Sequence, residues 1–165
     1  MNWKDFEYFD EEWKHRIKKM AEFIPESGRI VDLGCGRMWL KEIIDEKNHS
    51  YIGVDYTPRD ENTIVCDFNL KEFPNIEAEV YFASGVLEYV KNYKWFISNI
   101  ARHSQRCILS YCPIEVFNNK KERIDLGWKN HLNSFEIIKL FKKANMQLRF
   151  LTETNTRNKI FVFDV

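Results

Sequence analysis

The sequence lacks the features that mark several classes of protein. It has no excess of charge, because 25 basic residues balance 25 acidic ones, so we expect no basic surface for sequence-independent nucleic-acid binding. No apolar run approaches the ~20 residues of a transmembrane helix. Residues 1–5 lack the basic and apolar leader of a secreted protein. We therefore expect a cytoplasmic protein that binds neither nucleic acid nor a membrane.

Cysteine is present four times but in no metal-binding pattern. No CxxC pair occurs, and no histidine lies at zinc-finger spacing from a cysteine. We expect reduced thiols and no metal. The chain of 165 residues is 44% hydrophobic, enough for the core of one compact domain. We expect this single domain to span residues 1–165, with an N-terminal helix within 1–28 and the core in 29–165.

Apolar residues recur every three or four positions between Phe6 and Ile24. This spacing predicts an amphipathic helix that begins near Asp10. From Trp13 onward the expected role is packing against a sheet. A role in closing over a ligand site stays open for the first nine residues, which include Trp3, Phe6, Tyr8 and Phe9.

Residues 29–40 organise the rest of the chain. A buried strand leads to Asp32, a tight turn follows on Gly34 and Gly36, and the apolar pattern of residues 37–47 predicts a helix. Glycine lets a ligand lie against the backbone, and a helix start offers free N–H groups to an anion such as a carboxylate. A dinucleotide fingerprint would need glycine at position 39, where Trp39 stands, so a dehydrogenase is a weaker alternative.

The stretch Asp32-Leu33-Gly34-Cys35-Gly36 resembles the first motif of class I S-adenosylmethionine-dependent methyltransferases. The usual third glycine of that motif is Met38 here. Asp55 ends the next strand about 20 residues after the glycine turn, the separation expected for a carboxylate that accepts ribose hydroxyls. The resemblance further implies that Asp67 binds the adenine amino group and that Phe68 lies beside the ring. Expected cofactor contacts are Asp32, Gly34, Cys35, Gly36, Asp55, Tyr56, Asp67, Phe68 and Ser84.

The segment after the fourth strand, residues 84–90, resembles the same family and helps to choose among its branches. Ser84 is followed by Gly85 rather than by the Pro-Pro-aromatic sequence of nucleic-acid amino-methylating enzymes. The metal-dependent catechol-type enzymes have an aspartate at the position of Ser84, so the serine argues against a metal-dependent enzyme. Tyr89 stands where many relatives have histidine, so the candidates for a base are His131 and Glu88, with Tyr89 and Tyr111 as orienting groups. Taken alone, each of these residues fits a structural role better than a catalytic one.

The chain alternates strands and helices and closes with a hairpin over residues 147–164, which predicts an α/β fold. The linker of residues 57–62 is too short for a crossover helix, so the second core helix should be reduced or missing. A capped helix should begin at Asn133. The resemblance implies a Rossmann-like, mostly parallel seven-stranded sheet in the order 3-2-1-4-5-7-6, with the last strand antiparallel and helices on both faces.

The leading functional hypothesis is methyl transfer from S-adenosylmethionine to a small-molecule or sugar-like acceptor, with O-methylation favoured over N-methylation. Residues 112–132 are expected to form a long loop that leaves a strand end and contacts the acceptor. Its basic cluster, Lys120, Lys121, Arg123, Lys129 and His131, indicates an anionic acceptor, and a solvated loop without a ligand is an equal alternative. The alternative is a catalytically inactive methyltransferase-like partner subunit. The oligomeric state is not readable from the sequence.

Overall fold

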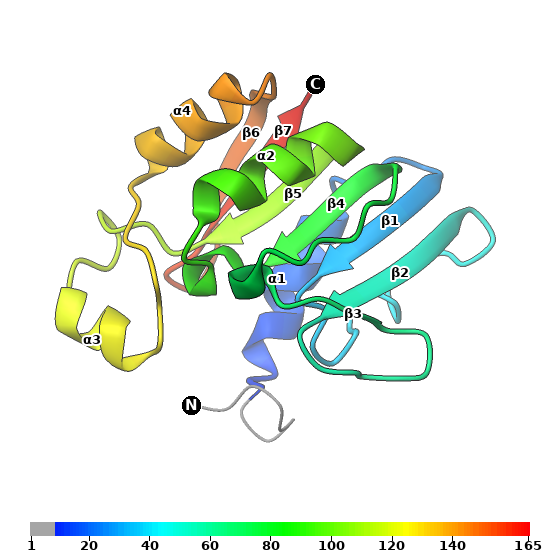
Figure 1. Ribbon diagram of the computed structural model, residues 1–165, viewed down its shortest axis with the longest axis horizontal. Helices are drawn as coiled ribbons and strands as arrows, with labels where there is room; N and C mark the ends of the chain where they lie inside the picture. The colour runs from blue at the N-terminus through cyan, green and yellow to red at the C-terminus, as the bar shows by residue number, and fades with distance from the viewer. Residues whose placement is uncertain (1–8) are drawn as a thin grey trace.

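The structure is a computed structural model that describes residues 9–165, and its centre is a seven-stranded sheet (Figure 1). The strand order is β3-β2-β1-β4-β5-β7-β6. Strands β1 to β5 run parallel to one another, and β7 runs antiparallel to β5 and β6. The predicted order and the antiparallel last strand are confirmed. The strands are β1 (Gly28–Leu33), β2 (His49–Asp55), β3 (Ile64–Val65), β4 (Ala78–Ser84), β5 (Ser104–Tyr111), β6 (Gln147–Glu153) and β7 (Lys159–Asp164).

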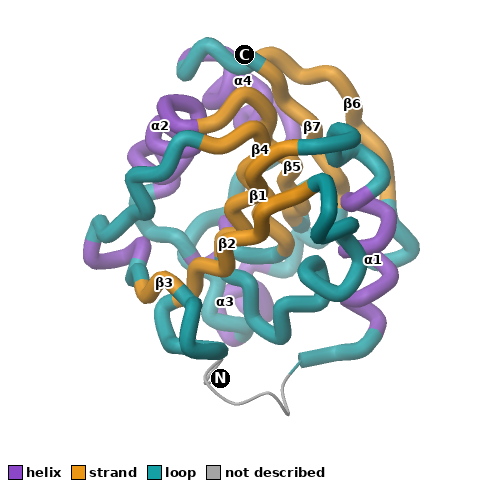
Figure 2. Tube along the Cα trace, turned by 90° about the vertical axis from the view of Figure 1, so that its right-hand side faces the viewer, coloured by secondary structure: helices purple, strands orange, loops and turns teal. Residues whose placement is uncertain are grey.

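Helices cover both faces of the sheet, as Figure 2 shows. The helix α1 (Glu12–Ala21) lies on one face, where Met20 packs with Ile30 and Val80 of the strands. The helices α2 (Tyr93–His103) and α4 (Ser134–Lys143) lie on the other face. The central strands are buried on both sides, as expected for parallel strands covered by helices. Across residues 9–165, no helix has the length and apolar character needed to cross a membrane.

The predicted helix over residues 37–47 is wrong. These residues form a series of turns, held by short-range hydrogen bonds such as Met38 N to Cys35 O at 2.7 Å and Lys41 N to Met38 O at 3.0 Å. Met38 has φ = 58°, a left-handed conformation that cannot be part of a right-handed helix. Leu40 is still buried against the α1 face of the sheet. The glycine turn therefore leads into no helix, and the expected N–H groups of a helix start are missing there.

The other connections agree more closely with the sequence. The linker between β2 and β3 contains no helix, as predicted. Asn133 and Glu136 form the predicted capping box at the start of α4, with both hydrogen bonds at 2.8 Å. Residues 112–132 are less irregular than expected, because they contain the short helix α3 (Lys120–Asp125). Two 3-10 turns, η2 (Phe68–Leu70) and η3 (Leu87–Tyr89), follow the ends of β3 and β4.

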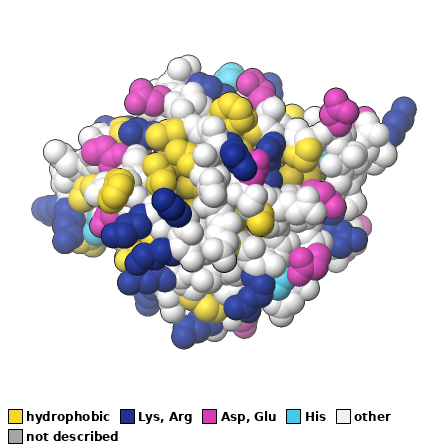
Figure 3. Space-filling model, turned by 90° about the horizontal axis from the view of Figure 1, so that it is seen from above, with side chains coloured by type: hydrophobic (Ala, Val, Ile, Leu, Met, Phe, Trp, Pro, Cys, Tyr) yellow, Lys and Arg dark blue, Asp and Glu magenta, His cyan; other side chains and the backbone are white. Residues whose placement is uncertain are grey.

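The surface carries both signs of charge. Figure 3 shows acidic and basic side chains spread over one face, around patches of exposed apolar atoms. This agrees with the zero net charge of the chain.

Candidate functional site

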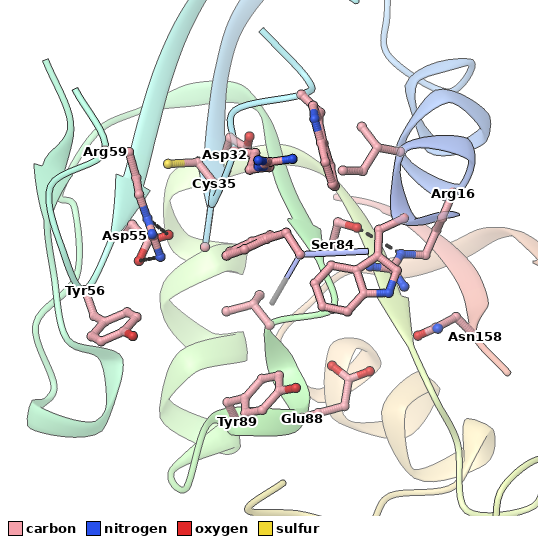
Figure 4. Close-up of a pocket in the computed structure, with 18 of the residues that line it drawn as sticks. Arg16, Asp32, Cys35, Asp55, Tyr56, Arg59, Ser84, Glu88, Tyr89 and Asn158 are labelled. Carbon is pink, nitrogen blue, oxygen red and sulfur yellow. Dashed lines mark hydrogen bonds and ion pairs between the residues drawn. The ribbon is translucent and has the colours of Figure 1, made fainter. Parts of the chain in front are cut away.

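The candidate site lies beyond the carboxyl ends of β1, β2 and β4, where ligands bind in open α/β sheets. Two adjoining cavities of about 230 and 410 Å³ open there, together within the size of a small-molecule site. The first is lined on one side by α1 and on the other by the turn after β4 (Figure 4). The second lies toward η2. Both cavities are lined by Gly34, Asp55, Tyr56, Val86 and Tyr89.

The glycine turn forms the wall between β1 and β2. The N–H groups of Gly34 and Cys35 both donate to Val54 O, at 2.8 and 3.0 Å. Gly34 has φ = 69°, and a Cβ atom there would lie 2.8 Å from the side chain of Val86. Gly36 has φ = 49°, and its N–H donates to Asp55 Oδ2 at 2.9 Å. Both glycines are therefore required by backbone conformation, and the turn is fixed to the end of β2.

Asp32 lies beneath this turn and is almost fully buried, with 4% of its surface exposed. The hydroxyl of Tyr51 donates to Asp32 Oδ2 at 2.7 Å. Burial raises the pKa of the Asp32 carboxyl to about 7; the Tyr51 bond opposes this shift, and the nearby Asp55 charge adds to it. Asp32 therefore takes up or releases its proton close to neutral pH.

We expect the protein to lose stability as pH rises from about 4 to about 7, because of Asp32. In this interval the folded state keeps the Asp32 proton, whereas the unfolded chain loses it near its ordinary pKa of 3.8. Asp32→Asn removes this titration and keeps an acceptor for Tyr51. Urea unfolding from pH 4.5 to 8 should show that the variant gains stability relative to the parent as pH rises. Parallel stability curves for the two proteins would contradict the raised pKa.

Asp55 is paired with an arginine that the sequence analysis missed. Arg59 Nε lies 3.2 Å from Asp55 Oδ2, and Arg59 Nη2 lies 3.3 Å from Oδ1. Only 5% of the Asp55 side chain and 2% of the Arg59 side chain are exposed. The Arg59 guanidinium lies 5.5 Å from the ring centre of Phe9. The expected ribose-binding carboxylate thus already has two partners, Gly36 N–H and Arg59. Asp55 and Arg59 are four residues apart, which is the spacing of an ion pair on a helix. Because no helix was expected in this linker, the spacing did not predict the pair.

Other predicted cofactor contacts lie around the second cavity. Asp67 caps η2, because its Oδ1 accepts from Asn69 N at 2.8 Å. Phe68 packs into the core, with its ring centre 4.8 Å from that of Phe96. Both residues line the second cavity, and Tyr56 lines both cavities. Phe9 lines the first cavity, whereas Trp3, Phe6 and Tyr8 lie outside the described residues.

The turn after β4 supplies a buried carboxyl group. Glu88 is 2% exposed and lines the first cavity. Its Oε1 accepts from Cys112 N at 2.9 Å, and its Oε2 is buried with no hydrogen-bond partner among residues 9–165. Burial raises the pKa of Glu88, opposed in part by backbone hydrogen bonds and by the charges of Arg16 and Arg123. Tyr89 lies beside it and lines both cavities.

Arg16 reaches the first cavity from α1 and was also missed, because the spacing of the helix predicted only packing from Trp13 onward. Arg16 is 7% exposed, and its Nε donates to Ser84 Oγ at 3.1 Å. Its guanidinium also lies 5.6 Å from the ring centre of Trp13. Ser84, one of the predicted contacts, is thus held by a cation from the N-terminal helix.

His131 is not brought together with Glu88 and Tyr89. Its Nδ1 accepts from Arg123 Nε at 3.1 Å, and the described lining of the two cavities does not include it. Partial burial and the charges of Arg123 and Lys120 lower its pKa. Of the predicted basic cluster, only Lys129 lines a cavity, the second one. The neighbouring Trp128 lines the first cavity.

The described part of the chain contains neither a disulfide nor a cluster of metal ligands. Cys35, Cys66, Cys107 and Cys112 are buried free thiols. No group of three or more His, Cys, Asp or Glu side chains between residues 9 and 165 could hold a metal ion.

Comparison with known proteins gives the family. No curated protein matches this sequence. Among solved structures, a putative methyltransferase from Haloferax volcanii, in complex with the Trm112 activator, has a TM-score of 0.77 at 16% identity and covers 96% of this chain and 92% of its own. A Burkholderia thailandensis 1,6-didemethyltoxoflavin N1-methyltransferase, solved with that molecule and S-adenosylhomocysteine, has a TM-score of 0.72 at 12% identity and covers 94% and 79%.

CalO1, a methyltransferase in calicheamicin biosynthesis solved with S-adenosylhomocysteine, has a TM-score of 0.69 at 15% identity over 93% of this chain. The present chain spans only 54% of CalO1. At these identities the solved structures show a shared fold. Residues 6–151 match the family described as a methyltransferase domain. The chain therefore belongs to the methyltransferase domain family, as the resemblance of its glycine turn predicted.

Proposed function

We propose that the protein transfers the methyl group of S-adenosylmethionine to a small-molecule acceptor. The observation that carries this proposal is the meeting of three segments at one edge of the sheet. The glycine turn after β1, Asp55 at the end of β2 and the segment from Ser84 to Tyr89 after β4 all line the same pair of cavities. The Burkholderia neighbour, solved with its small-molecule acceptor, supports this choice of acceptor class.

The residues present fit the cofactor, with one adjustment. Asp67 and Phe68 line only the second cavity, which suits adenine. Asp55 lies where the cavities meet and suits the ribose hydroxyls, because a carboxylate accepts two donors at once. Gly34 leaves room for a ligand against the backbone. The adjustment is at Arg59, which must give up at least one of its contacts with Asp55.

When bound, the cofactor supplies an electrophilic methyl group on a sulfonium. The protein then has to align the acceptor and take up its proton. Glu88 and Tyr89 line the first cavity, so we assign them these roles: Glu88 accepts the proton and Tyr89 orients the acceptor. A carboxylate in this position favours O-methylation over N-methylation, because a hydroxyl must lose its proton. His131 is the weaker candidate, since it is bound to Arg123 and lies outside the lining of both cavities.

Lys129 supports an anionic group on the acceptor, because it is the part of the basic cluster that lines a cavity. This assignment places the anionic group near the second cavity and the reacting hydroxyl near Glu88. The first cavity has several aromatic side chains in its lining, among them Phe9, Trp13 and Trp128, and these suit a flat acceptor.

The second candidate function is that of a catalytically inactive partner subunit. The specific observation in its favour is the ion pair between Arg59 and Asp55, which occupies the place expected for the ribose. The Haloferax neighbour, a putative methyltransferase solved with an activator protein, makes a partner plausible for this fold. Under this alternative, the cavities could still hold S-adenosylmethionine or S-adenosylhomocysteine, but no methyl group would be transferred to an acceptor.

Calorimetry with S-adenosylmethionine, S-adenosylhomocysteine and NAD tests the proposal. We expect micromolar binding of the first two and none of NAD. Turnover of a panel of phenols, sugars and amines should then give a rate that rises with pH as Glu88 ionises. Glu88→Gln should lose this pH dependence and about 100-fold in rate, within the usual range for a general base, while it binds S-adenosylhomocysteine as the parent does. Binding without turnover of any acceptor would favour the partner subunit, and binding of NAD alone would contradict both.

A further inference from the structure

The guanidinium of Arg16 is a buried cation without a matching carboxylate. Residues 9–165 offer it one hydrogen bond, from Nε to Ser84 Oγ, and no ion pair within 4.0 Å. Glu88 acts on it only as a more distant charge. Burial lowers the pKa of Arg16, which reflects the cost of holding its charge away from water. Such a charge is stabilised by an anion that completes the site.

The guanidinium is also held in place. Ser84 Oγ accepts a hydrogen bond from its Nε (Figure 4). The ring centre of Trp13 lies 5.6 Å from the guanidinium carbon. Gly85 has φ = 64°, and a Cβ atom there would lie 3.0 Å from Arg16 Nη2, so the missing side chain leaves space for the guanidinium. Arg16 lines the first cavity, and no hydrogen bond within residues 9–165 involves its terminal nitrogens. An arginine held in this way presents a fork of donors that matches a carboxylate.

The order of residues along the two cavities indicates which carboxylate would arrive there. Asp67 lines only the second cavity, Asp55 lines both, and Arg16 lines only the first. S-adenosylmethionine has the same linear order of adenine, ribose and an amino-acid tail. With adenine near Asp67 and ribose at Asp55, the tail points toward Arg16.

We propose that Arg16 binds the carboxylate of the amino-acid tail of S-adenosylmethionine. This inference rests on the proposed function and extends it to α1, which no motif of the sequence assigned to the cofactor. It also gives a role to the N-terminal helix: the helix closes the tail end of the site as well as covering the sheet. The helix start after the glycine turn, which was expected to bind this anion, does not exist in the fold.

Decarboxylated S-adenosylmethionine gives a direct test, because it keeps the sulfonium and the amine and lacks only the carboxylate. By calorimetry the parent protein should bind S-adenosylmethionine about 10- to 100-fold more tightly than the decarboxylated molecule, the range of a hydrogen-bonded charge pair. Arg16→Met should lose this preference and bind both molecules with similar affinity. Arg16→Lys should keep part of it. The control is Lys18→Met, an exposed position on the same helix, which should behave as the parent does.

Two outcomes would overturn the inference: a parent protein that binds both molecules equally, or a folded Arg16→Met protein that still prefers the carboxylated one. The comparison within the parent needs no variant, so it stands if Arg16→Met does not fold. A parent that binds neither molecule would instead contradict the proposed function.

Discussion

Replacing Asp55 with Ala is expected to abolish measurable binding of S-adenosylhomocysteine and to lower the free energy of unfolding by about 3–5 kcal/mol, as for one partner removed from a buried ion pair. The first effect follows from the loss of both acceptors for the ribose hydroxyls. The second follows because Arg59, 2% exposed in its side chain, would keep its charge but lose the carboxylate that lies 3.2 Å away. Gly36 N–H would lose its acceptor as well. Calorimetry and urea unfolding measure the two effects separately.

Two further variants separate the two roles of Asp55. Asp55→Ala combined with Arg59→Met should recover most of the lost stability, because no unpaired charge remains, but it should still not bind the nucleoside. Arg59→Met alone should bind S-adenosylhomocysteine more tightly than the parent. In this variant Asp55 does not have to release Arg59 before it accepts the ribose hydroxyls. If Arg59→Met weakens binding instead, then Arg59 is itself a cofactor contact and the site needs no opening. If Asp55→Ala binds normally, then the ribose lies elsewhere.

The strands and the place of the candidate site could be predicted from the sequence because both depend on local signals, whereas the order of the strands came from the resemblance to the methyltransferases. Each strand is an apolar run, and Asp55 has a fixed distance from the glycine turn. The short linker after β2 directly predicted the missing second helix, since too few residues remain to cross the sheet. The capping box at Asn133 is a pattern of two residues three positions apart, so it was readable in the same way.

What could not be predicted depends on single residues whose conformation is set by the fold. Met38 fits the apolar spacing of a helix, but its left-handed backbone ends any helix at that point. Arg16 and Arg59 look like ordinary surface charges in the sequence, because neither the hydrophobic spacing nor the motif shows that they turn inward. The sequence placed Arg123 in one basic cluster with Lys120, Lys121 and Lys129, although none of the surface of Arg123 is exposed. A buried arginine has the same sequence signature as a solvated one, and only its partners distinguish it.

Those partners show that Arg123 organises the segment between β5 and α4. Its Nη1 donates to Cys112 O at 3.0 Å and to Phe117 O at 3.1 Å, and its Nε donates to His131 Nδ1. The guanidinium lies 4.6 Å from the ring centre of Trp128, which lines the first cavity. One side chain thus links the beginning, the middle and the end of residues 112–132. Asn130 attaches the same segment to the turn after β4 through Leu87 O at 2.7 Å and Val90 O at 3.0 Å.

We expect Arg123→Met to loosen residues 112–132 and to remove turnover while it leaves cofactor binding nearly intact. The change removes the donor to the buried carbonyl of Cys112 and to the partly buried carbonyl of Phe117, so the free energy of unfolding should fall by about 3 kcal/mol. Trp128 would lose the cation beneath its ring, and the acceptor side of the first cavity would lose its fixed wall. The cofactor contacts at Gly34 and Asp55 belong to other segments, so the affinity for S-adenosylhomocysteine should change less than about threefold, under 1 kcal/mol.

Hydrogen exchange resolved by peptide distinguishes this local effect from general destabilisation. Protection should fall in residues 112–132 of the Arg123→Met protein and stay unchanged in β1 and β2. Lys121→Met, two residues away on the exposed side of α3, removes a positive charge from the same helix and should change neither exchange nor turnover. A loss of protection across the whole sheet would mean that Arg123 supports the fold as a whole. A matching loss of cofactor affinity would mean that the acceptor wall and the nucleoside site form one unit, because only a shared structure could transmit the change to Asp55.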